Sequence, residues 1–254
     1  MISLINDDCF NAIKNIDDNS IDLIIIDPPY LTTNEDWDKE EVVNGSLSKE
    51  LFRVAKDSCS IYIWCGIGEK SQSLIRWFPI FQKDWYFKDL ITWKKQRGIG
   101  MRRGWLYTRE ECMWFVKDNK QFTWNKEEQY SKEKRPFSIR EKGGKMVNKS
   151  EYKRFTNVWC DIFELGFGTS PQKFSDSRNY HFTPKPTELA ERIIKLHTKE
   201  NDTVLDCFMG SGFTVKACIN LNRDFIGIEK DKDIFTNTEI DIKNLISEKN
   251  LEIV

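Results

Sequence analysis

The segment IDLIIIDPPY, residues 21–30, constrains the fold more than any other part of the 254-residue chain. Five of its first six side chains are apolar, which is typical of a strand buried on both faces of a sheet. Two prolines follow Asp27, and because proline cannot donate to a strand ladder, we predict that the strand ends near this aspartate. Open α/β sheets bind their ligands at the carboxyl ends of the strands, so the residues after this strand are candidates for chemistry.

Strand and helix signals alternate through residues 1–93 and resume after Thr183, which predicts βαβ units and a largely parallel sheet. We expect strands near Leu4–Ile5 and over residues 21–26, 59–66, 89–93, 111–116, 203–208 and 224–229. We expect helices over residues 10–16, 47–55, 69–77, 186–198 and 212–221, and a last one from about Lys232.

Charge is distributed unevenly along the chain. Residues 94–154 carry 18 Lys and Arg against 8 Asp and Glu, whereas the rest of the chain carries 21 against 32. Such a basic segment in an otherwise acidic protein is typical of a polyanion partner. A solvated basic face without a partner is the alternative. Because residues 111–116 resemble one more core strand, we predict that an inserted segment begins near residue 117.

Composition excludes several classes of protein. Hydrophobic residues make up 39% and charged residues 31% of the chain, which favours a globular protein over a disordered one. No run approaches the roughly 18 apolar residues of a membrane span, and the amino-terminal residues lack the pattern of a secretion signal. The seven cysteines never form a CxxC pair, so we expect reduced thiols in a cytosolic protein rather than a zinc site. His181 and His197 have no partner nearby in sequence for a triad or a metal.

A second group of candidate residues lies in DTVLDCFMGSGFT, residues 202–214. A predicted strand ends at Asp206–Cys207, and Gly210-Ser211-Gly212 makes a tight turn into a helix. Glycines at such a turn let a ligand approach the backbone, and the helix start offers free amides. The next predicted strand ends at Glu229, an acid that can bind both hydroxyls of a ribose. The pattern indicates a nucleoside-bearing cofactor, with a plain strand-to-helix turn and a solvent-exposed Glu229 as the alternative.

Taken together, three motifs resemble those of the β group of S-adenosylmethionine-dependent DNA amino-methyltransferases, which are common in type II restriction–modification systems. The motifs are Asp27-Pro28-Pro29-Tyr30, Thr183-Pro184-Lys185-Pro186, and the DCFMGSG stretch over 206–212. Their order, with DPPY first, a variable basic segment next and the glycine loop last, is that of this group. The resemblance covers nearly the whole chain, from Ile5 to about Phe235. The chain departs at Phe213, where members usually carry threonine, so packing or cofactor contact there can differ.

The resemblance implies an α/β fold with a circularly permuted, Rossmann-like methyltransferase sheet, mostly parallel with one antiparallel edge hairpin. Residues 1–116 would form the catalytic half, 117–178 a DNA-recognition insert, and 179–254 the cofactor-binding half of the same domain. It also implies S-adenosylmethionine as cofactor, double-stranded DNA as partner, no metal, no membrane and a cytoplasmic location in a bacterium or phage host. A homodimer and a separately acting restriction endonuclease are compatible with it.

The residues of DPPY suit methylation of an exocyclic amine, whose lone pair is delocalised into the base. The Asp27 carboxylate and the Pro28 carbonyl can each accept one amine hydrogen, and Pro29 helps to fix the direction of that carbonyl. Tyr30 offers a ring on which an extracted base can stack, because a base inside a duplex must be flipped out to reach such a site. Within the family, serine in place of Asp27 goes more often with cytosine N4, so the aspartate favours adenine N6. Cytosine-N4 methylation and a non-catalytic DNA-binding subunit with this fold remain the alternatives.

The resemblance and the basic segment also supply candidates for binding. Three of these residues have a second interpretation: Asp8 equally suits a cap on the helix that begins near Phe10, Lys185 can simply precede a helix, and Trp37 lines the pocket or packs its loop. The cofactor candidates are Asp7, Asp8, Asp27, Lys185, Asp206, Phe208, Gly210, Ser211, Gly212 and Glu229. The DNA candidates, most of them expected on phosphates and one or two on guanine edges, are Arg97, Arg102, Arg103, Arg109, Lys134 and Arg135, with Lys153 and Arg154 beside them.

Overall fold

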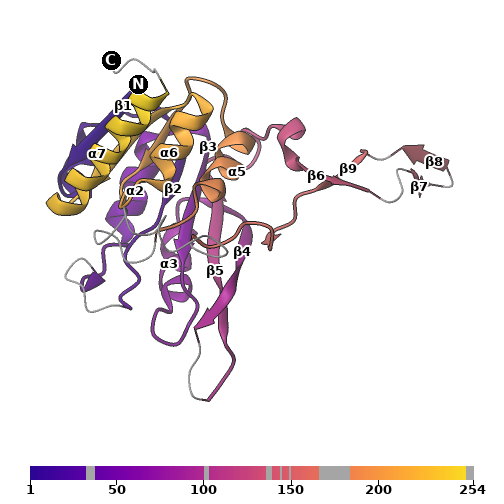
Figure 1. Cartoon of the computed structure of the whole chain (residues 1–254), viewed down its shortest axis with the longest axis horizontal. Helices are drawn as coiled ribbons and strands as arrows, with labels where there is room; N and C mark the ends of the chain where they lie inside the picture. The colour runs from indigo at the N-terminus through magenta and orange to yellow at the C-terminus, as the bar shows by residue number, and fades with distance from the viewer. Residues whose placement is uncertain are drawn as a thin grey trace.

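The computed structural model describes residues 1–32, 38–99, 103–135, 139–143, 145–148, 150–165 and 184–249. Its centre is one eight-stranded sheet with the strand order β1-β12-β11-β2-β3-β5-β4-β10 (Figure 1). β5 runs antiparallel to both of its neighbours, and every other neighbouring pair in this sheet is parallel. These strands are β1 (Ile2–Asn6), β2 (Ile21–Ile26), β3 (Ala55–Cys65), β4 (Tyr86–Ile99), β5 (Tyr107–Val116), β10 (Val158–Trp159), β11 (Thr203–Asp206) and β12 (Asp224–Glu229).

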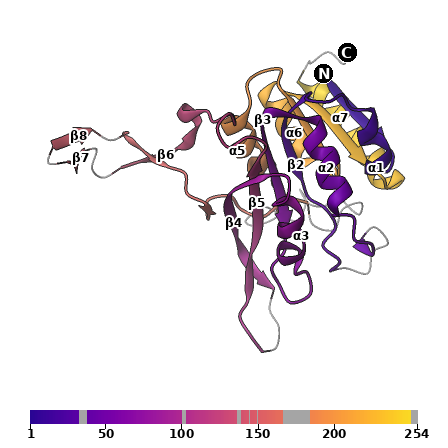
Figure 2. The ribbon, with the colours of Figure 1, turned by 180° about the vertical axis from the view of Figure 1, so that it is seen from behind.

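Helices cover both faces of the sheet. Along β2, Ile24 and Ile26 point into one apolar cluster, while Leu23 and Ile25 point into a second cluster on the opposite face. The first cluster is closed by α1 (Cys9–Ala12), a 3₁₀ turn η1 (Ile13–Asn15), α2 (Gly45–Val54) and α3 (Ser73–Phe81) (Figure 2). The second is closed by α5 (Thr187–His197), α6 (Phe213–Leu221) and α7 (Lys232–Glu248). β2 is therefore buried on both faces, as its run of isoleucines predicts.

The chain leaves two adjacent strands toward opposite faces of the sheet. β2 and β11 are neighbours, with Leu23 opposite Val204 and Ile24 opposite Leu205. The chain then passes from β2 to α2 on one face and from β11 to α6 on the other. A ligand crevice forms outside the carboxyl ends of parallel strands at such a switch point. The fold thus places residues 27–30 and 207–212 beside the same crevice.

The basic segment is divided between two projections. The β4–β5 hairpin continues past Cys65, the last residue of β3, and its last pair is Ile99 with Tyr107. Beyond the 3₁₀ turn η3 (Lys126–Gln129), an arm extends sideways from the sheet (Figures 1 and 2). Two antiparallel pairs form this arm: β6 (Tyr130–Lys134) with β9 (Tyr152–Arg154), and β7 (Ile139–Lys142) with β8 (Lys145–Asn148).

Most predicted elements are present, with a few shifted boundaries. The helix predicted over residues 69–77 begins only at Ser73, because Gln72 adopts a left-handed backbone with φ 47° and the Gly66 amide donates to the Ser73 hydroxyl at 2.7 Å. The helix predicted over residues 10–16 is one short α-helical turn followed by η1. The predicted hairpin is β4–β5, although the two-residue strand β10 lies outside it at the sheet edge. None of the described helices is long and apolar enough to cross a membrane.

Candidate active site

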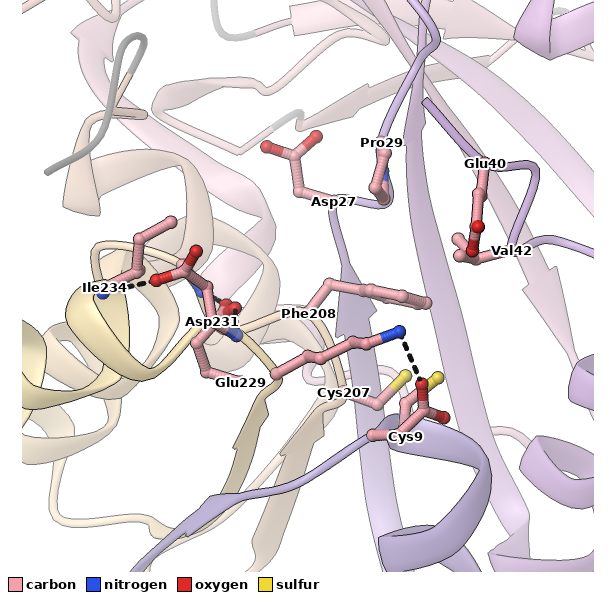
Figure 3. Close-up of a pocket in the computed structure, with 13 residues that line it drawn as sticks. Cys9, Asp27, Pro29, Glu40, Val42, Cys207, Phe208, Glu229, Asp231 and Ile234 are labelled. Carbon is pink, nitrogen blue, oxygen red and sulfur yellow. Dashed lines mark hydrogen bonds and ion pairs between the residues drawn. The ribbon is translucent and has the colours of Figure 1, made fainter. Parts of the chain in front are cut away.

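A cavity of about 390 Å³ lies at the carboxyl ends of β1, β2, β11 and β12. Figure 3 shows Asp27 and Pro29 on one side of it, Glu229 and Asp231 on another, and Phe208 between them. The lining residues are Asp8, Cys9, Asp27, Pro29, Glu40, Val42, Cys207, Phe208, Gly210, Glu229, Lys230, Asp231 and Ile234. The two motifs predicted to meet, DPPY and the glycine turn, therefore share one cavity, and this prediction of their proximity is confirmed.

Asp27 sits in a network of charged and hydroxyl groups. Its Oδ1 accepts a hydrogen bond of 2.6 Å from the Tyr30 hydroxyl, and its Oδ2 receives one of 2.5 Å from Lys185 Nζ. Lys185 Nζ also lies 3.2 Å from Glu110 Oε2, and only 7% of the Lys185 side chain is exposed. The Tyr30 ring packs edge-on against Trp77 with centroids 5.9 Å apart. Tyr30 and Lys185 thus contact Asp27 from behind the cavity rather than lining it.

The opposite charges of this network stabilise one another's ionised forms. Burial raises the pKa of the Glu110 carboxyl, but the cations of Lys185 and Lys95 outweigh burial and hold that pKa below its usual value. Burial also lowers the pKa of Lys185, yet Asp27 and Glu110 together raise it well above that of a free lysine. Burial, Asp27 and Glu110 all raise the pKa of Tyr30, so its hydroxyl stays protonated and donates a hydrogen bond to Asp27.

The glycine turn and Glu229 form the opposite wall. Gly210, with φ 51°, lines the cavity, and its amide donates to Glu229 Oε2 at 2.9 Å. Glu229 Oε1 accepts from the Asp231 amide at 2.8 Å. Burial raises the pKa of Glu229 above its usual value although both amides lower it. An ionised carboxylate has about four acceptor positions, so Glu229 can also accept from a ligand in the cavity.

Not every candidate near the turn faces the cavity. Asp206 is fully buried, and its two oxygens accept from the Phe208 amide at 3.0 Å and the Thr214 hydroxyl at 2.7 Å, so it holds the turn together. Gly212 takes φ 78°, and a Cβ there would lie 2.9 Å from side-chain carbons of Val215 and Thr238. Gly212 is therefore required for packing, whereas the argument that glycine admits a ligand applies to Gly210. Ser211 and the start of α6 do not line the cavity either.

Asp8, which follows β1, fills both roles that the sequence allowed: it caps a helix and it lines the cavity. Its Oδ1 caps α1 by accepting from the Phe10 amide at 2.9 Å, and the residue also lines the cavity. Its Oδ2 lies 3.1 Å from Lys230 Nζ. Asp7 lies outside the cavity and accepts from the Asp8 amide at 2.7 Å. Pro28 is buried and does not line the cavity, and Trp37 and Thr183 lie outside the described residues.

Sequence reasoning missed several residues of the site. Glu110 lies on β5 and reaches Lys185 only because β5 inserts between β3 and β4. Lys230 and Asp231 directly follow Glu229, so their place after a strand end was a usable signal. The other missed lining residues are Cys9, Glu40, Val42, Cys207 and Ile234. Among the described residues, no group of three or more His, Cys, Asp or Glu side chains could hold a metal ion.

The DNA candidates are distributed over the hairpin and the arm. Arg103 is exposed beside the hairpin tip, and Arg109 is 52% exposed with its Nε 3.1 Å from Glu111. On the arm, Lys134 is 69% exposed and lies 2.7 Å from Glu151, while the Arg135 Nε donates to the Tyr152 carbonyl. Lys153 and Arg154 are exposed on β9. The Arg97 side chain and the whole of Arg102 lie outside the described residues.

Comparisons with known proteins identify the family to which this chain belongs. Residues 21–239 match the DNA methylase family of N6 and N4 enzymes. The type II methyltransferase M.HpaI of Haemophilus parainfluenzae is 34% identical over 91% of this chain and 70% of its own length. The type II methyltransferase M1.MboII of Moraxella bovis is 30% identical over 89% of this chain and 90% of its own. The chain belongs to the DNA methylase family.

Solved structures agree with the fold of this DNA methylase. The crystal structure of the M1.HpyAVI–SAM complex superposes with a TM-score of 0.63 at 26% identity, covering 95% of this chain and 100% of that one. The cytosine-N4-specific PvuII DNA methyltransferase superposes with a TM-score of 0.72 over 94% of this chain and 85% of that one. At 14% identity the PvuII likeness concerns the fold alone.

Proposed function

We propose that this DNA methylase transfers a methyl group from S-adenosylmethionine to the N6 amine of a flipped adenine at a specific site in duplex DNA. The observation that carries the proposal is the Asp27 network at the rim of a cavity whose opposite wall is Gly210 and Glu229. This arrangement provides an acceptor for an amine beside a compartment suited to a nucleoside. The aspartate in DPPY, rather than serine, favours adenine over cytosine.

The cavity suits the cofactor in volume and in chemistry. Its 390 Å³ falls within the usual range of about 300–1,000 Å³ for small-molecule sites. Glu229 would accept from the ribose hydroxyls, the Phe208 ring offers an apolar surface, and Asp8 with Lys230 would hold polar groups near the end of β1. When bound, S-adenosylmethionine supplies an electrophilic methyl carbon on a sulfonium centre that is a good leaving group.

The residues of DPPY act on the target base. Asp27 would accept one hydrogen of the adenine amine and the Pro28 carbonyl the other, which directs the nitrogen lone pair toward the cavity. Lys185 and Tyr30 hold the carboxylate in place through hydrogen bonds of 2.5 Å and 2.6 Å. As the nitrogen gains a methyl group it loses one proton, which Asp27 Oδ2 or Oδ1 can take and pass to water. The extracted base would stack on Tyr30, and positioning supplies most of the acceleration.

DNA binding would use the two projections. In our proposal residues 1–116 and 179–254 form the two halves of the catalytic domain, and residues 117–178 recognise the DNA sequence. Lys134, Arg135 and Arg103 would contact phosphates and base edges. We place the protein in the bacterial cytoplasm in a type II restriction–modification system, where a separate endonuclease would cut the same site and the methylase would act alone or as a homodimer.

The test is methylation of random-sequence duplex DNA, followed by nucleoside analysis and mapping of the modified bases. We expect N6-methyladenine at one short sequence. Detection of N4-methylcytosine alone would reject the choice of base but leave the methyltransferase activity standing. If S-adenosylmethionine does not bind in isothermal titration calorimetry, the protein has only a structural, DNA-binding role and the proposal is wrong.

A further inference from the structure

Trp105 is more exposed to solvent than any other large apolar side chain that the structure describes. Its exposed fraction is 92%, and that of the next residue, Leu106, is 65%. The preceding Gly104 has φ 126°, a backbone region that favours glycine, so the chain turns immediately before the tryptophan. Tryptophan is seldom presented to water without a binding partner because its large ring gains much from burial. The tip of the β4–β5 hairpin therefore carries an apolar wedge made of Trp105 and Leu106.

Strand β5, which begins directly after the wedge, connects it to the active site. Glu110 of β5 lies 3.2 Å from Lys185, which donates to Asp27. Trp105 precedes Glu110 by five residues, a separation of at most about 18 Å in an extended chain. Stacked bases in one strand rise by about 3.4 Å each. Trp105 and Glu110 thus lie no farther apart than about five base-pair steps, and Glu110 in turn contacts Lys185 beside Asp27.

A loop also couples the hairpin to DPPY. A Cβ added at Gly66 would lie 3.6 Å from the Tyr30 ring, and one added at Gly68 would lie 3.7 Å from the Tyr107 ring. The segment after β3 therefore packs against the active site and against the end of the hairpin nearest its tip. Tyr107 pairs with Ile99 as the hairpin's last rung before the tip. These contacts hold the wedge in a defined direction relative to the site.

The charges around the wedge match duplex DNA rather than a protein surface. Arg103 and Lys94 are exposed on the hairpin, and the side chain of Arg109 is 52% exposed. The segment that contains them, residues 94–154, has ten more basic than acidic residues. An apolar tip flanked by cations can enter a base stack while the cations contact the phosphates on either side.

We propose that Trp105, supported by Leu106, inserts into the DNA stack beside the target adenine and occupies the space that the flipped base leaves. This inference rests on the proposed function, since it requires a base that leaves the helix. The wedge would lower the free energy of the extrahelical state by replacing the lost stacking. It would matter most where the target is well paired, and least where pairing is already lost.

The experiment compares Trp105→Ala, Trp105→Phe and wild type on two duplexes carrying the mapped site. One duplex has thymine opposite the target adenine and the other has an abasic position there. We expect Trp105→Ala to lower kcat/KM at least tenfold on the paired duplex and less than threefold on the abasic one, with Trp105→Phe retaining most activity on both. The control is Tyr86→Ala, which removes a 57% exposed aromatic ring at the opposite end of β4 and should change neither value.

Equal losses of kcat/KM on both duplexes would show that Trp105 acts in general DNA binding or in hairpin folding, and would overturn the proposed insertion. Wild-type activity of Trp105→Ala on the paired duplex would overturn it as well. Both results leave the proposed function intact because wild type still methylates. A wild-type protein inactive on every duplex would instead remove the proposed function and the wedge with it.

Discussion

Replacing Lys185 by methionine tests whether the active-site charges are held as a buried ion network. The change keeps most of the side-chain volume but removes the ammonium that lies 2.5 Å from Asp27 Oδ2 and 3.2 Å from Glu110 Oε2. At an effective dielectric constant of about 20, contacts of this length are worth about 5–7 kcal/mol each before desolvation. Because desolvation of the ammonium offsets much of that gain, we expect the free energy of unfolding to fall by about 3–5 kcal/mol at pH 8.

The loss should also depend on pH in a defined direction. In the wild type, the lowered pKa of Glu110 makes it contribute stability above its unfolded pKa of 4.5, and that contribution is lost as the pH falls through its lower folded pKa. Without Lys185, burial should raise the pKa of Glu110, and a raised carboxyl pKa destabilises the fold as pH rises. The difference between variant and wild type should therefore shrink by about 1 kcal/mol or more from pH 8 to pH 5.

Urea denaturation followed by tryptophan fluorescence at pH 8 and pH 5 measures both quantities. The matched control is Lys56→Met, which breaks a pair of similar length, 2.8 Å to Asp22, but with a lysine side chain 40% exposed. We expect that control to lose less than about 1 kcal/mol at either pH. If Lys185→Met loses no more than the control, or loses the same amount at both pH values, the network does not act as a buried ion cluster.

Three further predictions concern the turn, the core and the cofactor wall. Gly212→Ala should lower the free energy of unfolding by at least about 1–2 kcal/mol, because the residue has φ 78° and its new Cβ would lie 2.9 Å from Val215 and Thr238. The control is Gly45→Ala, whose Cβ would lie in open space and which should cost nothing measurable in the same denaturation assay. Burial lowers the pKa of His197 to about 4, so its contribution to stability is complete above pH 6.5 and is lost as the pH falls toward 4. Relative to His197→Gln, the wild type should therefore lose about 2 kcal/mol of unfolding free energy between pH 7 and pH 5. A difference between the two proteins that does not change with pH would contradict this. Glu229→Gln should weaken S-adenosylmethionine binding in calorimetry at least tenfold, because loss of a charged hydrogen bond costs about 1.5–3 kcal/mol. Unchanged affinity would show that Glu229 does not bind the cofactor.

The sequence predicted much of the fold because its strands and helices have strong local signals. The isoleucine run at 21–26, followed by Asp27 and two prolines, indicated both where β2 lies and which residues after it belong to the site. The amphipathic helix after Pro186 and the strand at 224–229 had equally clear signals, and the strand predicted over 203–208 is present over 203–206. The start of α3 was not, because a side-chain hydrogen bond from Gly66 to Ser73 determines it, and that contact spans seven residues.

The site was only partly predictable for the same reason. Asp27, Gly210 and Glu229 stand at strand ends, where position in the sequence gives position in the crevice. Glu110 stands within a strand beside Glu111, and nothing local distinguishes which of the two will meet Lys185, 75 residues later. Asp206 and Gly212 lie in the correct motif, but their roles in the turn and in packing depend on Thr214 and Thr238, which only the folded structure brings close.

In the mechanism we propose, Asp27 serves the transfer step rather than the binding of the cofactor. The direct measurement is paired: S-adenosylmethionine affinity by calorimetry and transfer of labelled methyl groups to duplex DNA, for wild type, Asp27→Ala and Asp27→Asn. We expect affinities within threefold of one another and methyl transfer reduced by a factor of about 10² or more in both variants. Near-normal turnover by either variant would contradict it.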